Sequence, residues 1–82
     1  MNKKILRFTA DWCNPCKQLT ENIQRANLTI PIETIDIESD DARATEFGVR
    51  NLPTMILVVD DKEISRMVGL KTPKQIREWA GK

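Results

Sequence analysis

The chain has 82 residues, of which 40% are hydrophobic and 30% are charged, and 13 Lys and Arg side chains against 12 Asp and Glu give a net charge of +1. This size and composition predict one ordinary globular domain over residues 1–82 with a modest core. The balanced charge does not favour a nucleic-acid or membrane partner, and no apolar run approaches the roughly 20 residues of a membrane-spanning helix. Arg7 and Asp11 interrupt any signal-peptide core at the N-terminus, so we expect a cytoplasmic protein.

The first part of the chain predicts a strand, a helix and a second strand. Apolar and charged residues alternate over residues 3–10, which is typical of a strand. From residue 14 to about residue 26 the apolar spacing becomes helical, and Asn27 would end the helix. Residues 30–37 are rich in β-branched side chains and predict a strand, and a β-α-β order requires the two strands to be parallel. The apolar face of the helix would consist of Cys16, Leu19, Ile23 and Ala26.

A short helix and a hairpin are predicted next. Asp40 or Asp41 would cap a helix that continues through Phe47 and ends at Gly48. Residues 55–59 form the most continuous apolar run and predict the most buried strand. The four residues after it, 60–63, predict a turn that lacks the Gly or Asn of an ideal one, and an antiparallel edge strand would follow up to Val68.

The last helix has the clearest start signal in the chain. Thr72 at the N-cap, Pro73 at the first helical position and Gln75 three residues after the cap predict a capping box, and Gly81 would end the helix. Its apolar face would consist of Ile76, Trp79 and Ala80. The complete order βαβ-α-ββα predicts an α/β fold with a four-stranded mixed sheet flanked by helices.

The two cysteines of the chain, Cys13 and Cys16, stand between the first strand and the helix that follows it. At such a junction a C-x-x-C spacing indicates a redox-active dithiol rather than half of a metal site. A zinc site needs four ligands, and a chain with two Cys and no His cannot supply a cysteine/histidine set. Unpaired N–H groups and the positive end of the helix dipole favour a thiolate at Cys13. We therefore expect Cys13 to attack and the more enclosed Cys16 to resolve.

Three segments resemble thioredoxin. Residues 8–17 (FTADWCNPCK) look like the family's active-site segment, residues 47–54 (FGVRNLPT) are similar to the segment that ends in its cis-proline, and Val68-Gly69 matches its glycine loop. By this resemblance we expect the chain to lack the family's leading strand and helix, and so to be similar to the short thioredoxins of glutaredoxin-like length found in archaea and phages. The resemblance implies a thioredoxin-like fold and a protein disulfide reductase.

The resemblance also implies a substrate groove. A cis Leu52-Pro53 bond would face the cysteines and turn backbone groups outward to pair with an extended substrate peptide. Without the dithiol, a trans proline at the start of a strand would be the simpler interpretation. The substrate-binding residues would be Trp12, Asn14, Pro15, Leu52, Pro53 and Gly69.

The chain departs from the family pattern at several positions. Arg7 stands where thioredoxins carry a buried aspartate behind the second cysteine, and Thr34 stands where they carry its lysine partner. Thr9 replaces a tryptophan, and Glu21 replaces the proline that kinks the first helix. We expect the Arg7 guanidinium to reach solvent along its long stem.

These observations predict a monomeric thiol-disulfide oxidoreductase that acts on disulfide-containing proteins and binds no cofactor. By family analogy, electrons would come from NADPH through a flavoprotein thioredoxin reductase. One alternative is a glutaredoxin-like reductase recycled by glutathione; against it, Asn14-Pro15 lies between the cysteines instead of a Pro-aromatic pair, and Trp12 precedes them. Another alternative is a binding module that uses the fold without catalysis, which would not need the cysteines.

Overall fold

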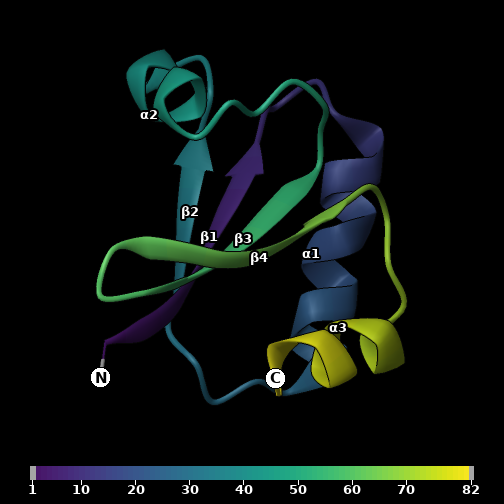
Figure 1. Cartoon of the computed structure of the whole chain (residues 1–82). Helices are drawn as coiled ribbons and strands as arrows, with labels where there is room; N and C mark the ends of the chain where they lie inside the picture. The colour runs from purple at the N-terminus through teal and green to yellow at the C-terminus, as the bar shows by residue number, and fades with distance from the viewer. Residues whose placement is uncertain (1, 82) are drawn as a thin grey trace.

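The helices and strands of the computed structural model, which describes residues 2–81, follow the order predicted from the sequence (Figure 1). In chain order they are β1 (Lys3–Thr9), α1 (Asn14–Ala26), β2 (Ile32–Asp36), α2 (Asp41–Glu46), β3 (Thr54–Val59), β4 (Lys62–Val68) and α3 (Pro73–Ala80). The four strands form one sheet in the order β2-β1-β3-β4. β1 is parallel to β2 and antiparallel to β3, and β3 is antiparallel to β4. The predicted mixed sheet is therefore confirmed.

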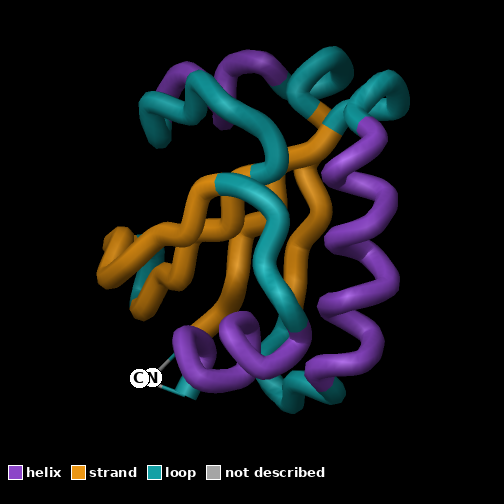
Figure 2. Tube along the Cα trace, turned by 90° about the vertical axis from the view of Figure 1, so that its right-hand side faces the viewer, coloured by secondary structure: helices purple, strands orange, loops and turns teal. Residues whose placement is uncertain are grey.

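Two apolar clusters cover the two faces of the sheet, because successive side chains of a strand point to opposite faces. Figures 1 and 2 show α1 running alongside the sheet, with α3 beside its lower end. The cluster under α1 and α3 consists of Ile5, Leu19, Ala26, Met55, Leu57, Ile76, Trp79 and Ala80. The cluster on the α2 side consists of Leu6, Phe8, Ile35, Ala44, Ile56 and Val58. The odd-numbered residues of β1 thus face α1, and the even-numbered ones face α2.

The ends of the helices are set by the caps that the sequence predicts. Asn27 adopts the left-handed conformation, with φ of 52°, directly after α1. The side chain of Asp40 accepts the N–H of Arg43 at the start of α2, and Gly48 follows that helix with φ of 64°. In α3 the reciprocal hydrogen bonds of a capping box join Thr72 to Gln75, as expected. None of the helices within residues 2–81 is long and apolar enough to cross a membrane.

The hairpin differs from the prediction. Its turn consists of Asp60 and Asp61 alone, with φ of 52° and 68°, and β4 begins at Lys62 rather than at residue 64. A two-residue hairpin turn of type I′ requires positive φ at both positions, and aspartate tolerates that conformation better than most residues. Asp60 is also held in place, since its carboxylate accepts the N–H of Asn2 at 3.0 Å and its own N–H donates to the carbonyl of Asn2 at 2.9 Å. These two hydrogen bonds support a tight turn without glycine.

β2 and α1 also differ in detail from the prediction. β2 begins at Ile32, two residues later than predicted. The carbonyl of Pro31 still accepts the N–H of Ile5, but Pro31 has no N–H with which to extend the ladder. On α1 the buried residues include Asn22, which the apolar pattern did not single out, whereas Ile23 is only half-buried. The buried face of α1 is therefore rotated slightly from the predicted one.

Candidate functional site

The two cysteines lie where the chain leaves β1 and enters α1. Cys13 is the N-cap of α1 with an extended backbone, and its Sγ accepts the N–H of Cys16 at 3.2 Å. The two residues form a disulfide, with their Cα atoms 5.2 Å apart. The helix start thus supplies an unpaired N–H to the sulfur of Cys13, as expected for a site that stabilises negative charge there.

The two sulfur-bearing residues differ in their access to the surface. Cys13 is 5% exposed and lines an open cavity, while Cys16 is 1% exposed and does not line it. Ala10 packs against both cysteines, and Ile37 and Leu52 complete this small apolar cluster. An incoming group can therefore reach the disulfide from the Cys13 side.

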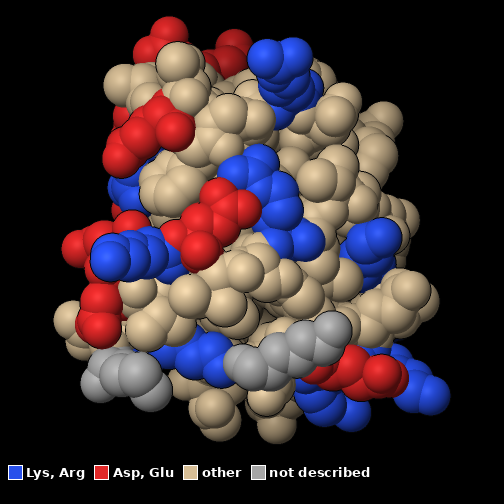
Figure 3. All heavy atoms as spheres, in the orientation of Figure 1, with Lys and Arg blue, Asp and Glu red and all other residues tan. Residues whose placement is uncertain are grey.

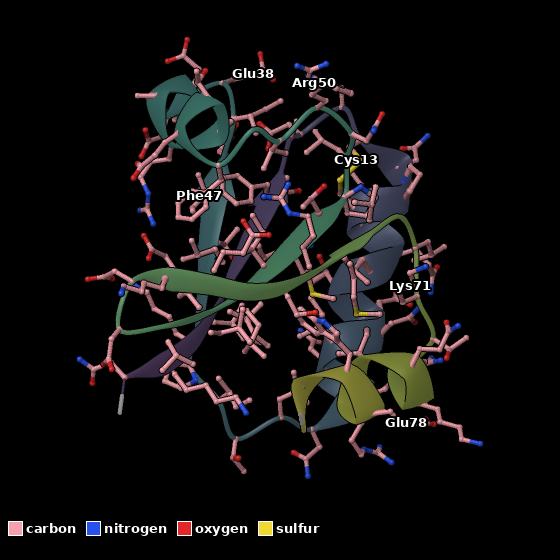
Figure 4. All side chains as sticks on the ribbon, viewed as in Figure 1. Cys13, Glu38, Phe47, Arg50, Lys71 and Glu78 are labelled. Carbon is pink, nitrogen blue, oxygen red and sulfur yellow. A yellow bond between two sulfur atoms is a disulfide. The ribbon has the colours of Figure 1, made fainter. Side chains whose placement is uncertain are left out.

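The cavity beside Cys13 has a volume of about 420 Å³. Of the predicted groove residues, Trp12, Asn14, Pro15 and Leu52 line it, and the Trp12 ring is 65% exposed. Figure 4 shows Cys13 and Arg50 at the same upper end of the molecule. The lining residues that the sequence did not single out are Ile37, Arg50 and Asn51.

The remaining predicted groove residues, Pro53 and Gly69, do not line the cavity. The Leu52-Pro53 peptide bond is cis, and Pro53 is buried rather than part of the cavity lining. The N–H of Gly69 donates to the carbonyl of Pro53 at 2.8 Å, and Gly69 has φ of 94°, which favours glycine. The hydroxyl of Thr54 donates to the carbonyl of Asn51 at 2.6 Å. The Gly69–Pro53 bond joins the loop before β3 to the glycine loop, and the Thr54–Asn51 bond closes the end of the former loop.

Arg7 is largely buried under α1 rather than turned out to solvent, so the expectation for this residue is wrong. Its side chain is 9% exposed and points to the α1 side of the sheet, where Nη2 donates to the carbonyl of Cys16 at 2.8 Å and to the hydroxyl of Thr20. Nε is buried without a hydrogen-bond partner, and burial lowers the pKa of the guanidinium. The physical reason is its place in a central strand, since α1 covers the odd-numbered face of β1 before the stem can reach water. Thr34, its partner in the β1–β2 register, is exposed.

The acidic residues near β2 and α2 serve the local structure. Glu33 accepts hydrogen bonds from Arg43 at 2.7 Å and Lys4 at 3.0 Å, and these cations lower the pKa of Glu33 to about 2. The Asp36 carboxylate accepts the N–H of Glu38. Figure 3 shows Lys, Arg, Asp and Glu interspersed on the face presented there. Within residues 2–81, no three His, Cys, Asp or Glu residues are grouped so that they could hold a metal ion.

Comparison with known proteins agrees with this geometry. The thioredoxin family model matches residues 1–82. Thioredoxin of Chlamydia muridarum is 43% identical over 70 residues, which cover 82% of this chain and 69% of that protein. Thioredoxin of Rickettsia typhi is 28% identical over 82 residues, which cover 95% of this chain and 78% of that protein.

Solved structures agree as well. A mutant thioredoxin from Halobacterium salinarum superposes with a TM-score of 0.88 at 27% identity, covering 96% of this chain and 72% of that one. The fold therefore matches over nearly the whole chain, and the cysteine pair stands at disulfide distance within it. Because family model, sequence and fold all agree around that pair, this chain belongs to the thioredoxin family of thiol-disulfide oxidoreductases.

Proposed function

We propose that this protein reduces protein disulfides with Cys13 as the attacking thiol and Cys16 as the resolving thiol. The observation that carries the assignment is the position of Cys13, which caps α1, accepts the N–H of Cys16 and lines the cavity. A thiolate at Cys13 meets both the helix N-terminus and an approaching substrate. Cys16 is enclosed and can attack only a sulfur that Cys13 has already captured.

The reaction follows from this arrangement. The Cys13 thiolate attacks one sulfur of a substrate disulfide, the substrate S–S bond breaks, and the departing sulfur takes a proton from solvent. The Cys16 thiolate then attacks Cys13 Sγ, which forms the Cys13–Cys16 disulfide and releases the second substrate sulfur. Two electrons have passed from the dithiol to the substrate, and the protein is left in the disulfide state that the structure contains.

The cavity beside Cys13 is the proposed substrate groove. Trp12, Asn14, Pro15 and Leu52 would contact an extended peptide, and the exposed indole of Trp12 offers it an apolar surface. Pro53 and Gly69 would shape the loop edge behind the groove, since they are joined by a backbone hydrogen bond. The backbone groups of this edge would give affinity for any extended chain, which suits an enzyme with several protein substrates.

We further propose that the protein is a cytoplasmic monomer of one domain, reduced by a flavoprotein thioredoxin reductase with electrons from NADPH. The support is family membership, together with the dipeptide between the cysteines. Asn14-Pro15 differs from the Pro-aromatic pair usual in glutathione-dependent relatives.

Insulin reduction tests the proposal. The wild-type protein should reduce insulin with NADPH and thioredoxin reductase, and faster than with glutathione and glutathione reductase. Cys16→Ser should accumulate a mixed disulfide with insulin, whereas Cys13→Ser should neither reduce insulin nor trap it. Trapping by Cys13→Ser instead would reverse the two roles, and reduction that survives Cys13→Ser would rule out the dithiol mechanism.

A further inference from the structure

Arg7 is the one charged side chain among residues 2–81 that is buried, and the reaction as described above does not use it. The buried polar or charged residues of the described chain are Arg7, Asn22 and Thr54. Burying a cation in a small domain is costly, and the cost persists here because one guanidinium nitrogen has no partner. A buried guanidinium in this position therefore calls for a role beyond the stability of the fold.

The Arg7 guanidinium is hydrogen-bonded to the backbone carbonyl of Cys16. Nη2 lies 2.8 Å from the Cys16 carbonyl oxygen, and the Thr20 hydroxyl binds both that oxygen, at 3.1 Å, and the guanidinium. Covalent dimensions place the Sγ of a cysteine within roughly 5 Å of its own carbonyl oxygen. The positive charge is thus within about 8 Å of Cys16 Sγ, and both side chains are largely buried.

The surroundings of Cys16 otherwise disfavour a thiolate. Its sulfur is enclosed by apolar side chains from Ala10 and its neighbours, and burial of this kind favours the neutral thiol. A nearby cation has the opposite effect and favours the charged form. The guanidinium is therefore placed to offset the penalty that the apolar cluster imposes.

The other ionisable groups near Cys16 lie closer to solvent. Asp11 and Lys17 are its exposed neighbours along the chain, and Arg50 is exposed on the loop that faces Cys13 across the cavity. Cys13 itself carries no charge while it is joined to substrate in the mixed disulfide. Charges in contact with water are screened far more than a buried charge. The Arg7 guanidinium should therefore have the largest electrostatic effect on the Cys16 thiol.

We propose that Arg7 is a positioning residue for the resolving step, and that its buried guanidinium favours the Cys16 thiolate which releases the substrate. The proposal rests on the proposed function, in which Cys16 resolves the mixed disulfide. In that step the Cys16 thiol loses its proton to solvent, its sulfur bonds to Cys13 Sγ, and the bond from Cys13 to substrate breaks. The electron pair of that bond leaves with the substrate sulfur, which is then protonated, so no further reductant or oxidant is needed.

The expected shift in the titration midpoint of Cys16 follows from its distance to the guanidinium. At about 8 Å and an effective dielectric constant of about 20, one charge shifts a titration midpoint by roughly 1–1.5 pH units. Loss of the Arg7 charge should therefore raise the midpoint of Cys16 by about one unit and lower its thiolate fraction at pH 7 about tenfold. Each unit by which the titration midpoint rises also makes the thiolate itself about threefold more nucleophilic. The tenfold loss of thiolate is therefore partly offset, and the resolving step at pH 7 should slow by roughly threefold.

The first test measures Cys16 alone, in the Cys13→Ser background, by titrating the ultraviolet absorbance of its thiolate. Arg7→Met, which has an apolar stem of similar length, and Arg7→Gln, which keeps a hydrogen-bond donor, should both raise the midpoint by about one unit. Arg7→Lys keeps the charge and should remain nearer the parent. Replacing a buried charge by an apolar residue is often neutral for folding, and circular dichroism checks that each variant is folded.

Two controls isolate the charge. Arg25→Met removes one positive charge from the exposed last turn of the same helix and should leave the Cys16 midpoint unchanged. Thr20→Val removes a hydrogen bond to the Cys16 carbonyl without changing any charge, and should have a smaller effect than Arg7→Met. A midpoint that is unchanged in both Arg7→Met and Arg7→Gln, or that moves as much in Arg25→Met, would overturn the proposal.

The second test follows the resolving step in the chain with both cysteines. Stopped-flow measurement of substrate release should show Arg7→Met about threefold slower at pH 7. The deficit should shrink as the pH rises and reverse above both titration midpoints, where the more basic thiolate of the variant is the better nucleophile. A purely structural role would slow release equally at every pH. Because the titration does not require activity, its failure refutes the role of Arg7 alone, whereas trapping by the wrong cysteine variant refutes the proposed function.

Discussion

Replacing Asn22 by alanine tests the link between α1 and the loop that leads into α3. Asn22 is 9% exposed, and its Nδ2 donates to the carbonyl of Lys71 at 2.8 Å. Its Oδ1 accepts a longer hydrogen bond of 3.3 Å from Gln18. Figure 4 labels Lys71 on that loop, close to α1. The carboxamide therefore bridges a helix and a loop that are 49 residues apart in the chain.

Two opposing effects set the size of the change. Losing the donor removes a buried hydrogen bond and leaves the Lys71 carbonyl to find another partner, which together cost about 1–3 kcal/mol. Alanine has the higher helix propensity, and this returns up to about 0.7 kcal/mol. The net result should be a destabilisation of about 1–2 kcal/mol. In a domain of this size that lowers the melting temperature by roughly 4–16 °C.

Urea unfolding of the oxidised protein measures this difference. Gln24→Ala is the matched control, because Gln24 lies on the same helix but is exposed, and its replacement should leave stability unchanged or slightly higher. Only Asn22→Ala should therefore lower the free energy of unfolding. If Asn22→Ala is as stable as the parent, or if Gln24→Ala loses as much, the bridge contributes nothing and the reasoning fails.

Three further predictions concern stability. Thr72→Ala should destabilise by about 1 kcal/mol through loss of the α3 N-cap, while Thr72→Ser should not, as urea unfolding would show; an equal loss in both would exclude capping as the cause. Because the pKa of Glu33 is lowered from 4.5 to about 2, its ion pairs should stabilise the fold above about pH 4.5 and cease to do so as the pH falls through 2. The Glu33 side chain is 40% exposed, so Glu33→Gln should cost about 1 kcal/mol or less at pH 7 and nothing near pH 2; a constant difference between these pH values would contradict the linkage. Trp79→Phe should cost about 1–3 kcal/mol, since the indole donates to the Ser65 hydroxyl at 2.9 Å; Ser65→Ala should cost less, and the reverse order would show that ring packing matters little.

The helices and their ends could be predicted because their signals are local. The capping box of Thr72 and the glycine after α2 specify helix ends through contacts within a few residues. The start of β4 could not be predicted in this way. Asp60 and Asp61 adopt a conformation that their sequence only weakly favours, and Asp60 is held there by hydrogen bonds with Asn2, which is far away in the sequence.

The cysteines of the candidate site could be predicted from their spacing and context, whereas the burial of Arg7, and of Asn22 elsewhere on α1, depends on tertiary structure. The alternation of side chains along a strand places Arg7 on the same face of β1 as the core residue Ile5, and this was the one sequence feature that pointed to its burial. It does not show that α1 closes over this face before the arginine stem reaches water. Arg50 joins the cavity because the loop before β3 folds back beside Cys13, a contact between segments far apart in sequence.

The two tryptophans of the chain lie in opposite environments, with Trp12 65% exposed on the cavity that Cys13 lines and Trp79 6% exposed in the core. A disulfide accepts an electron from a nearby excited indole and so quenches its fluorescence. Emission from Trp12, at the longer wavelength typical of a hydrated indole, should therefore rise when the cysteines are reduced. Emission from Trp79 should shift to longer wavelength only when the core opens. The protein thus carries two intrinsic optical reporters, and one spectrum can follow reduction and unfolding separately without an added label.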